Sequence, residues 1–159
     1  MKSKTRKLLI LILNLTIPLI VGGLAAALTS GGMAAFEDIS KPALTPPAIV
    51  FPIVWTVLYL LMGFSAFGVA TAKVKRRLRR NSLGIYAFQL ALNFLWTIIF
   101  FGTGNYIAAF VCLILLWLAV LLNILSFASI RPWTGYLQIP YLLWVTFAGY
   151  LNFMIYRMN

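Results

Sequence analysis

The stretch KPALTPPAIVFPIVWTVLYLLMG, Lys41 to Gly63, decides the fold because it joins a proline-rich segment to a long apolar run. Pro46 and Pro47 disfavour a helix in the residues before them, whereas Pro52 is tolerated in a first helical turn, where N–H groups lack partners anyway. The apolar run continues to Ala72, and about 20 residues at about 1.5 Å each cross a hydrocarbon core of about 30 Å. The pattern predicts a stiff loop followed by a membrane-spanning helix.

Four further apolar runs have a similar length, and little sequence lies outside them. Of the 159 residues, 63% are hydrophobic and 9% are charged, and the mean hydropathy is +0.99. Lipid cannot hydrogen-bond an exposed backbone, and the runs lack the alternation of barrel strands, so they predict helices. We expect an all-α integral membrane protein, a single domain over residues 1–159 built as a five-transmembrane-helix bundle. The expected spans are about 8–28, 49–72, 83–101, 107–128 and 135–156, with a loop at about 29–48.

Basic residues, which give a net charge of +11, are concentrated at one side of these spans. One cluster precedes the first span, and Lys73–Arg80 holds a second, whereas Lys41 and Arg157 lie on the other side. By the positive-inside rule, the N-terminus is cytoplasmic and the C-terminus outside. Because the charges flank spans, we expect the lipid bilayer rather than nucleic acid as partner, and a bacterial plasma membrane as location.

The first span has an alternative interpretation. Residues 2–30 combine a basic start, an apolar run and small residues, as a cleaved signal peptide does. The apolar run is long enough for a full span, so we favour a retained helix. An intact mass lacking about 28 residues would contradict five helices.

The residue types that carry most enzyme chemistry are scarce. The chain has no histidine and one cysteine, Cys112, and its two acidic residues, Glu37 and Asp38, are adjacent in one loop. These counts argue against a disulfide framework, a metal site and a catalytic carboxylate pair. The expected spans contain no carboxylate, which disfavours ion-coupled transport. We expect no metal and no cofactor.

Small residues spaced four apart mark places where helices can approach closely. The pairs are Gly22 with Ala26, Gly23 with Ala27, and Gly68 with Ala72. Packing within the chain is the favoured interpretation of each pair, and a homodimer interface stays open.

Three spans carry aromatic and polar side chains on one helical face. The stripes are Trp55, Tyr59 and Met62 in the second span, Tyr86, Gln89, Asn93, Trp96 and Phe100 in the third, and Tyr141, Trp144, Ala148 and Asn152 in the fifth. Trp and Tyr collect at membrane interfaces, but an amide inside a span usually faces the bundle interior. The stripes fit either plain packing or an aromatic cavity, and such a cavity favours flat apolar ligands.

Three segments resemble the signature blocks of a known family. They are KPALTPPAIVFPIVWTVLYLLMG at 41–63, QLALNFLWTIIFFG at 89–102 and PYLLWVTFAGYLNFMIYRMN at 140–159. Together they are similar to the translocator-protein family, also called tryptophan-rich sensory proteins or peripheral benzodiazepine receptors. The resemblance spans essentially the whole chain. It implies a five-helix bundle, often dimeric, with a pocket between helices that opens toward the first loop.

The resemblance also implies ligands and residues that bind them. Family members bind porphyrins such as protoporphyrin IX, haem-related tetrapyrroles, sterols and benzodiazepine-site compounds. By resemblance, the pocket positions are Trp55, Asn93, Trp96, Trp144 and Ala148, to which the stripes add Tyr59 and Tyr141. The loop from about 36 to 48 would form a lid that includes Phe36, Pro42, Leu44, Pro46 and Pro47. A porphyrin would be a ligand rather than a cofactor.

The chain departs from the family pattern in the first loop and near the C-terminus. Members often carry loop tryptophans, whereas this chain has Ala35 before Phe36, then Leu44, and Ile49. The lid is therefore expected to cover a ligand by apolar contact more than by stacking. The C-terminal sterol pattern is incomplete, because Phe153 stands where it needs a tyrosine.

Our main hypothesis is a membrane receptor or sensor-like protein that binds flat hydrophobic ligands, porphyrins first, between its helices. One alternative is a light-dependent porphyrin-degrading enzyme, with Trp55 and Trp144 as redox partners in place of an acid–base or metal site. Another is a transport or scaffold component without a small ligand. In that case aromatic ligands would give no thermal stabilisation.

Overall fold

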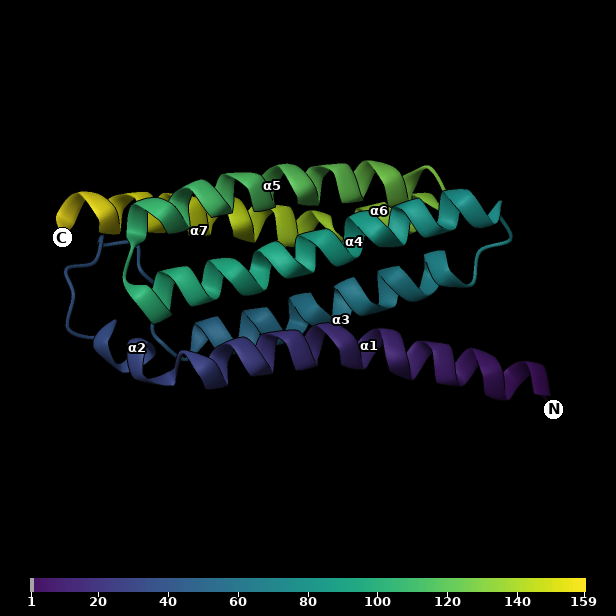
Figure 1. Cartoon of the computed structure of the whole chain (residues 1–159), viewed down its shortest axis with the longest axis horizontal. Helices are drawn as coiled ribbons and strands as arrows, with labels where there is room; N and C mark the ends of the chain where they lie inside the picture. Colours follow the sequence, from purple (N-terminus) through teal and green to yellow (C-terminus); the bar gives the residue numbers. More distant parts are fainter. Residues whose placement is uncertain (1) are drawn as a thin grey trace.

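The computed structural model describes residues 2–159, apart from the side chains of residues 2, 3, 33 and 34, as an all-helical bundle (Figure 1). Within this range, five segments are long and apolar enough to cross a membrane, namely 4–28, 50–70, 76–103, 106–128 and 132–158. The prediction of an all-α membrane protein with five spanning helices is confirmed.

The helices follow one another with short connections, except before α3. In chain order they are α1 Lys2–Leu28, α2 Ser30–Ala35, α3 Val50–Ala70, α4 Arg76–Thr97, the π-helix η1 Ile98–Thr103, α5 Tyr106–Ala128, α6 Pro132–Tyr136 and α7 Ile139–Met158. The N-terminus and the α3–α4 connection lie at one end of the bundle, and the C-terminus and the loop before α3 lie at the other (Figure 1). We call these the basic end, residues 71–80, and the loop end, residues 36–49.

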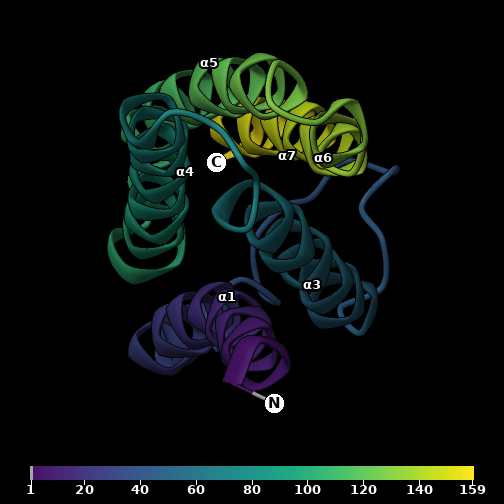
Figure 2. The ribbon, with the colours of Figure 1, turned by 90° about the vertical axis from the view of Figure 1, so that its right-hand side faces the viewer.

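The bundle consists of two packed groups of helices. α1 packs along α3, and α5 packs against both α4 and α7, as the view along the helices shows (Figure 2). α4 also contacts α1 and α3, so the interior lies between α3, α4, α5 and α7. The outward face of α1 remains exposed and apolar, through Leu9, Ile12, Leu13, Ile20 and Leu24. Such a face suits contact with lipid tails.

Several helix bounds differ from the expected spans for clear physical reasons. The third helix begins at Arg76 rather than near 83, because arginine is a good helix former and the helix continues beyond the apolar run. A short helix, α2, lies inside the expected loop. The last span is interrupted at residues 137–138, and Pro140 lies in the first turn of α7, where it is tolerated. Gly104, with a φ of 65°, ends η1 in the left-handed conformation that favours glycine.

Two glycines of the small-residue pairs serve packing within the chain. A Cβ at Gly22 would overlap the ring of Tyr59, and one at Gly68 would overlap the ring of Trp133. A Cβ at Gly23 would meet nothing within 4 Å. The first two glycines therefore let α1 approach α3 and α3 approach α6, whereas Gly23 faces away from the bundle.

Candidate functional site

An aromatic cluster, formed by Trp55, Tyr59, Trp96 and Tyr141, fills the bundle interior toward the loop end. The ring of Trp55 is stacked on that of Tyr59 with centroids 5.5 Å apart, and it lies 6.1 Å from the rings of both Trp96 and Tyr141. These side chains come from α3, α4 and α7. Pro52 in the first turn of α3 fixes where this helix begins, and Trp55 follows one turn later. The structure thus brings together four of the predicted residues, and we call them the interior cluster.

Asn93 links three helices beneath these rings. The Tyr59 hydroxyl donates a hydrogen bond of 2.8 Å to Asn93 Oδ1, and Asn93 Nδ2 donates one of 3.2 Å to the Tyr141 hydroxyl. All three side chains are buried, and Asn93 is fully so. The amide therefore holds the two phenol rings in place from α4, as expected for an amide inside a span.

A second amide, Asn152 of α7, fixes the indole of Trp96. Trp96 Nε1 donates to Asn152 Oδ1 over 3.1 Å, and Asn152 Nδ2 donates to the backbone carbonyl of Tyr106 over 2.7 Å. By contrast, the indole N–H groups of Trp55 and Trp144 form no hydrogen bond with any residue in the described range. Trp96 is thus held by the protein, and two of the predicted tryptophans keep a free donor.

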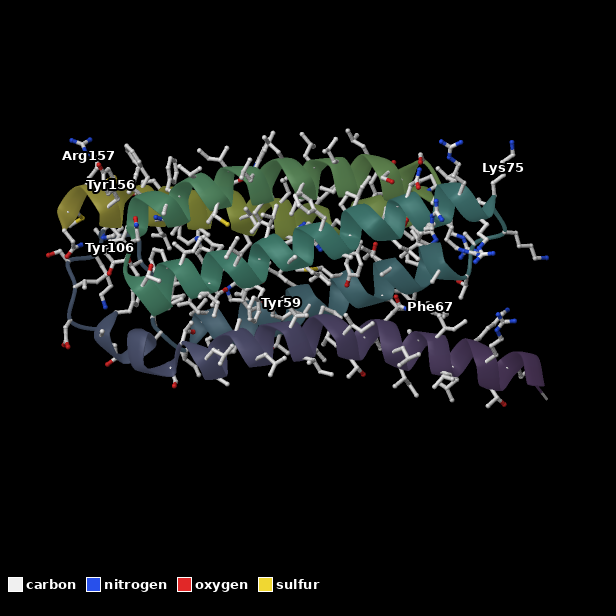
Figure 3. All side chains as sticks on the ribbon, viewed as in Figure 1. Tyr59, Phe67, Lys75, Tyr106, Tyr156 and Arg157 are labelled. Atoms are coloured by element: carbon white, nitrogen blue, oxygen red, sulfur yellow. The ribbon has the colours of Figure 1, made fainter. Side chains whose placement is uncertain are left out.

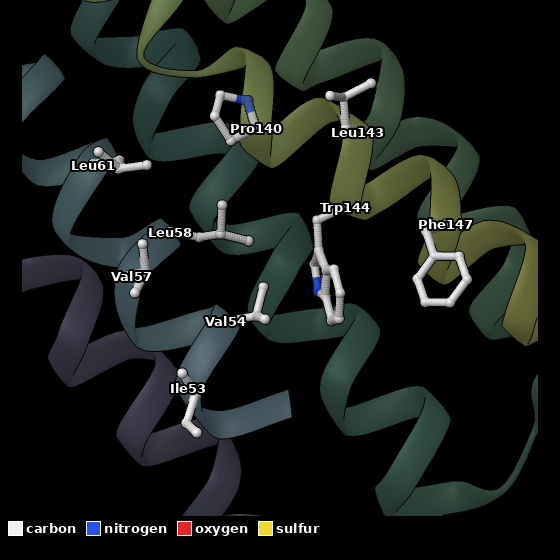
Figure 4. A pocket seen from close by; sticks show the side chains of 9 residues that line it. All are labelled: Ile53, Val54, Val57, Leu58, Leu61, Pro140, Leu143, Trp144 and Phe147. Atoms are coloured by element: carbon white, nitrogen blue, oxygen red, sulfur yellow. The ribbon is translucent and has the colours of Figure 1, made fainter. Parts of the chain in front are cut away.

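An open groove lies between α3 and α7 and has a volume of about 540 Å³ (Figure 4). Its lining is entirely apolar or aromatic and consists of Ile53, Val54, Val57, Leu58, Leu61, Pro140, Leu143, Trp144 and Phe147. The indole of Trp144 projects from α7 toward Val54 of α3 (Figure 4). Because Val57 and Leu143 are 51% and 65% exposed, the groove opens at the side of the bundle. We call it the lateral groove.

The predicted ligand-binding residues are therefore divided between two places. Trp144 contacts Phe51 and Phe147, with centroids 6.0 and 5.6 Å away, and forms no ring contact with the interior cluster. Ala148 packs against the core but does not line the groove. The two places adjoin along α3, because Val54 and Leu58 face the groove and their chain neighbours Trp55 and Tyr59 face the interior.

The predicted lid approaches the interior cluster through one of its residues. The ring of Phe36 lies 5.8 Å from that of Phe100 and 5.5 Å from that of Phe101, and both of these rings contact Trp96. Lys41 Nζ lies 4.8 Å above the Phe36 ring, which is a cation–π arrangement. Phe36 therefore closes the loop end of the cluster.

The other predicted lid residues differ in their burial. Pro42 is buried and Pro46 half-buried, whereas Pro47 is exposed and Leu44 is 66% exposed. None of them lines the lateral groove. The structure brings Phe36 to the predicted site but places Leu44 and Pro47 at the surface.

The loop is also tied to the chain's last residue. The backbone N–H of Ser40 donates to Asn159 Oδ1 over 3.1 Å, and Asn159 Nδ2 donates back to the Ser40 carbonyl over 3.0 Å. These reciprocal hydrogen bonds hold the middle of the loop against the end of α7.

A layer of buried polar side chains lies nearer the basic end. Tyr86, Gln89, Asn123 and Gln138 are buried, and within the described range at least one side-chain polar atom of each lacks a hydrogen-bond partner. The hydrogen bonds Ser82–Ser126 and Trp117–Thr146 fix the register of α4 and α7 on α5, which puts these residues at similar depths. Neither Asn123 nor Gln138 was among the residues predicted from the sequence. An amide inside or beside an apolar run usually faces the bundle interior, and this pattern could have identified both.

The site contains no recognisable centre for metal or acid–base chemistry. In residues 2–159, no group of three His, Cys, Asp or Glu side chains is placed to hold a metal ion. Both acidic residues lie in the loop before α3, away from the lateral groove. What the arrangement offers is aromatic surface, an apolar groove and free indole N–H groups.

These features define a class of protein, a five-helix membrane protein with an aromatic interior and an apolar groove open at its side. Residues 14–157 match the model of the TspO/MBR family, and the chain belongs to this family. The resemblance seen in the three sequence blocks is confirmed.

Relatives come from bacteria and animals. The chain is 39% identical over 137 residues to Protein CrtK of Rhodobacter capsulatus, which covers 86% of this chain and 85% of that protein. It is 37% identical over 124 residues to Tryptophan-rich protein TspO of Chlorobaculum tepidum, 78% of each chain. It is 33% identical over 134 residues to Translocator protein of Homo sapiens, 80% of this chain and 76% of that protein. Matches of this length relate whole membrane domains rather than isolated motifs.

Proposed function

We propose that the protein is a membrane receptor or sensor that binds flat hydrophobic ligands, porphyrins first, in the lateral groove. The observation that carries the proposal is the indole of Trp144 in an apolar groove that opens at the side of the bundle. A ligand dissolved in the bilayer reaches such a groove without crossing water. The volume of about 540 Å³ is typical of small-molecule sites, which measure about 300–1,000 Å³.

The chemistry of the lining limits the class of ligand. Stacking on an indole face contributes about 0.5–1.5 kcal/mol beyond the burial of apolar area. The free N–H of Trp144 offers one donor for a polar atom of the ligand. Since no lining residue carries a charge, the carboxylates of a porphyrin must stay at the membrane surface. Sterols satisfy the apolar requirement but lack a ring system that stacks.

The proposal is tested by a substitution that blocks the lateral groove with a large side chain and by measuring porphyrin binding. Val57→Trp places a bulky ring at a groove-lining position, whereas Leu60→Trp makes a similar change at an exposed position on α3 that does not line the groove. Protoporphyrin IX is titrated into each purified variant, and its own absorption band is followed, so that added tryptophans do not disturb the signal. We expect at least tenfold weaker binding for Val57→Trp, about 1.4 kcal/mol, and little change for Leu60→Trp.

A tryptophan deletion provides an independent check. Trp144→Ala removes the stacking face and the donor, and we expect a loss of about tenfold or more. Trp117→Ala is the matched control, because Trp117 lies on α5 with its N–H bound to Thr146 and does not line the groove. Equal affinities for wild type, Trp144→Ala and Val57→Trp would show that the groove is not the ligand site.

A second candidate function is light-dependent porphyrin degradation, in which dioxygen is the oxidant. The free indoles of Trp55 on α3 and Trp144 on α7 favour it, because Trp144 lines the groove and Trp55 follows the groove-lining residue Val54 in the chain. The bound complex is illuminated and its absorbance is followed for new products. The wild-type complex is compared with the double variant Trp55→Phe, Trp144→Phe and with free porphyrin. Bleaching of the porphyrin at the same rate in the wild type as in either of these would exclude this function.

A further inference from the structure

The first turns of α4 carry an unusual concentration of positive charge. Arg76, Arg77 and Arg80 are exposed and line an open hollow of about 460 Å³. Their guanidinium groups form no ion pair or hydrogen bond within the described range. Arg79 differs, because its Nη1 lies 3.4 Å from the Ala72 carbonyl and so points back toward the end of α3. Three of the four arginines thus face one hollow.

No acidic side chain in the described range lies near this positive charge. The only acidic residues, Glu37 and Asp38, belong to the loop before α3, at the opposite end of the bundle (Figure 1). Figure 3 shows side-chain nitrogens gathered around Lys75 at the basic end. α4 begins there without a side-chain cap and without an acidic residue in its first turn. Since a helix N-terminus is itself positive and favours anions, this end of α4 is electrostatically unfavourable until an anion binds.

We propose that Arg76, Arg77 and Arg80 form a binding site for the phosphate headgroup of an anionic membrane phospholipid. Arg76 and Arg80 are four residues apart and share a helix face, with Arg77 beside them. The planar guanidinium group donates two parallel hydrogen bonds to a phosphate, which a lysine ammonium does not match. The free N–H groups of the first turn of α4 add further donors toward an anion.

The surroundings of the hollow favour a lipid over a soluble phosphate. Leu78 lies among the arginines and is 42% exposed. Further along α4, Phe88 and Leu95 are 60% and 46% exposed on the apolar span that begins directly after the arginines. A phosphate at Arg80 therefore lies at headgroup depth, with exposed apolar side chains beyond it for the acyl chains to contact.

The experiment compares two charge-matched double variants of the full chain. Arg76→Gln with Arg80→Gln removes two charges from the hollow, and Lys73→Gln with Lys75→Gln removes two charges from the neighbouring segment, outside it. Native mass spectrometry counts the phosphatidylglycerol molecules that each variant retains. The affinity for phosphatidylglycerol is then measured in competition with phosphatidylcholine. Because the arginines line the hollow and the two lysines do not, the arginine pair is expected to lower affinity at least tenfold, and the lysine pair less than threefold.

Further arms separate the site from diffuse attraction and from folding defects. Equal losses in both double variants would overturn the proposal, because a diffuse electrostatic field does not distinguish the arginines from the lysines. No loss in either variant would overturn it as well. Arg76→Lys with Arg80→Lys keeps the charge, and we expect it to lose affinity nonetheless, since the paired hydrogen bonds are gone. Inorganic phosphate that displaced the lipid at equal concentration would indicate a soluble-anion site instead. Unchanged unfolding temperatures in phosphatidylcholine alone confirm that the variants fold.

Discussion

Replacing Asn93 by leucine tests whether the amide organises the interior cluster. Asn93→Leu keeps the number and branching of the side-chain heavy atoms but removes both hydrogen bonds, to Tyr59 and to Tyr141, and leaves two buried hydroxyls without the amide. Hydrogen bonds between membrane helices contribute about 0.6 kcal/mol each on average, and an orphaned buried polar group costs about 1–3 kcal/mol. The expected destabilisation is therefore about 2 kcal/mol.

The assay is thermal unfolding of the purified protein in one detergent. For a chain of this size, about 2 kcal/mol corresponds to a fall of about 4–8 °C in the unfolding temperature. The triple variant Tyr59→Phe, Asn93→Leu, Tyr141→Phe leaves no hydroxyl orphaned, so we expect it to recover at least half of the loss. An unchanged unfolding temperature for Asn93→Leu, or a triple variant less stable than the single one, would show that Asn93 does not organise the interior cluster.

Three further predictions follow from particular residues. Gly22→Ala is expected to lower the unfolding temperature by several degrees because its methyl overlaps a tyrosine ring, whereas Gly23→Ala is expected to be neutral or stabilising by up to about 1 kcal/mol; equal effects would contradict the α1–α3 packing. Asn123→Leu removes a buried amide that has no hydrogen-bond partner among the described residues, and it is expected to raise the unfolding temperature; a fall would contradict this. In intact cells, a membrane-impermeant thiol reagent is expected to label Leu44→Cys but not Lys75→Cys, and the reverse would invert the predicted orientation.

The sequence was sufficient to predict the five spanning helices and the inward-facing positions of several residues of the interior cluster. An apolar run of membrane length forms a helix because its backbone groups find no hydrogen-bond partners in lipid, so length and hydropathy identified the helices. Helical spacing placed Tyr59 and Asn93 on inward faces, and the structure joins them by a hydrogen bond. Both inferences depend on local features of the sequence, which are independent of how the helices are arranged.

The separation of Trp144 from Trp55 could not be predicted from spacing. It depends on the gap between α3 and α7, which is set by how α5 and α1 hold the two helices, and no single span encodes it. The start of α4 at Arg76 was missed because membrane thickness limits an apolar run but not the helix that contains it. The exposure of Leu44 was missed because a loop has no periodicity from which to assign faces.

The most direct test of the ligand site is fluorine NMR of the protein with its five tryptophans replaced by 5-fluorotryptophan. Single Trp→Phe variants assign the signals, and protoporphyrin IX is then added, since its ring current shifts nearby nuclei strongly. A ligand in the lateral groove is expected to shift the Trp144 signal most and to leave the signals of Trp117 and Trp133 unchanged. A Trp144 signal that stays in place while other tryptophans move, or equal shifts at all five, would contradict it.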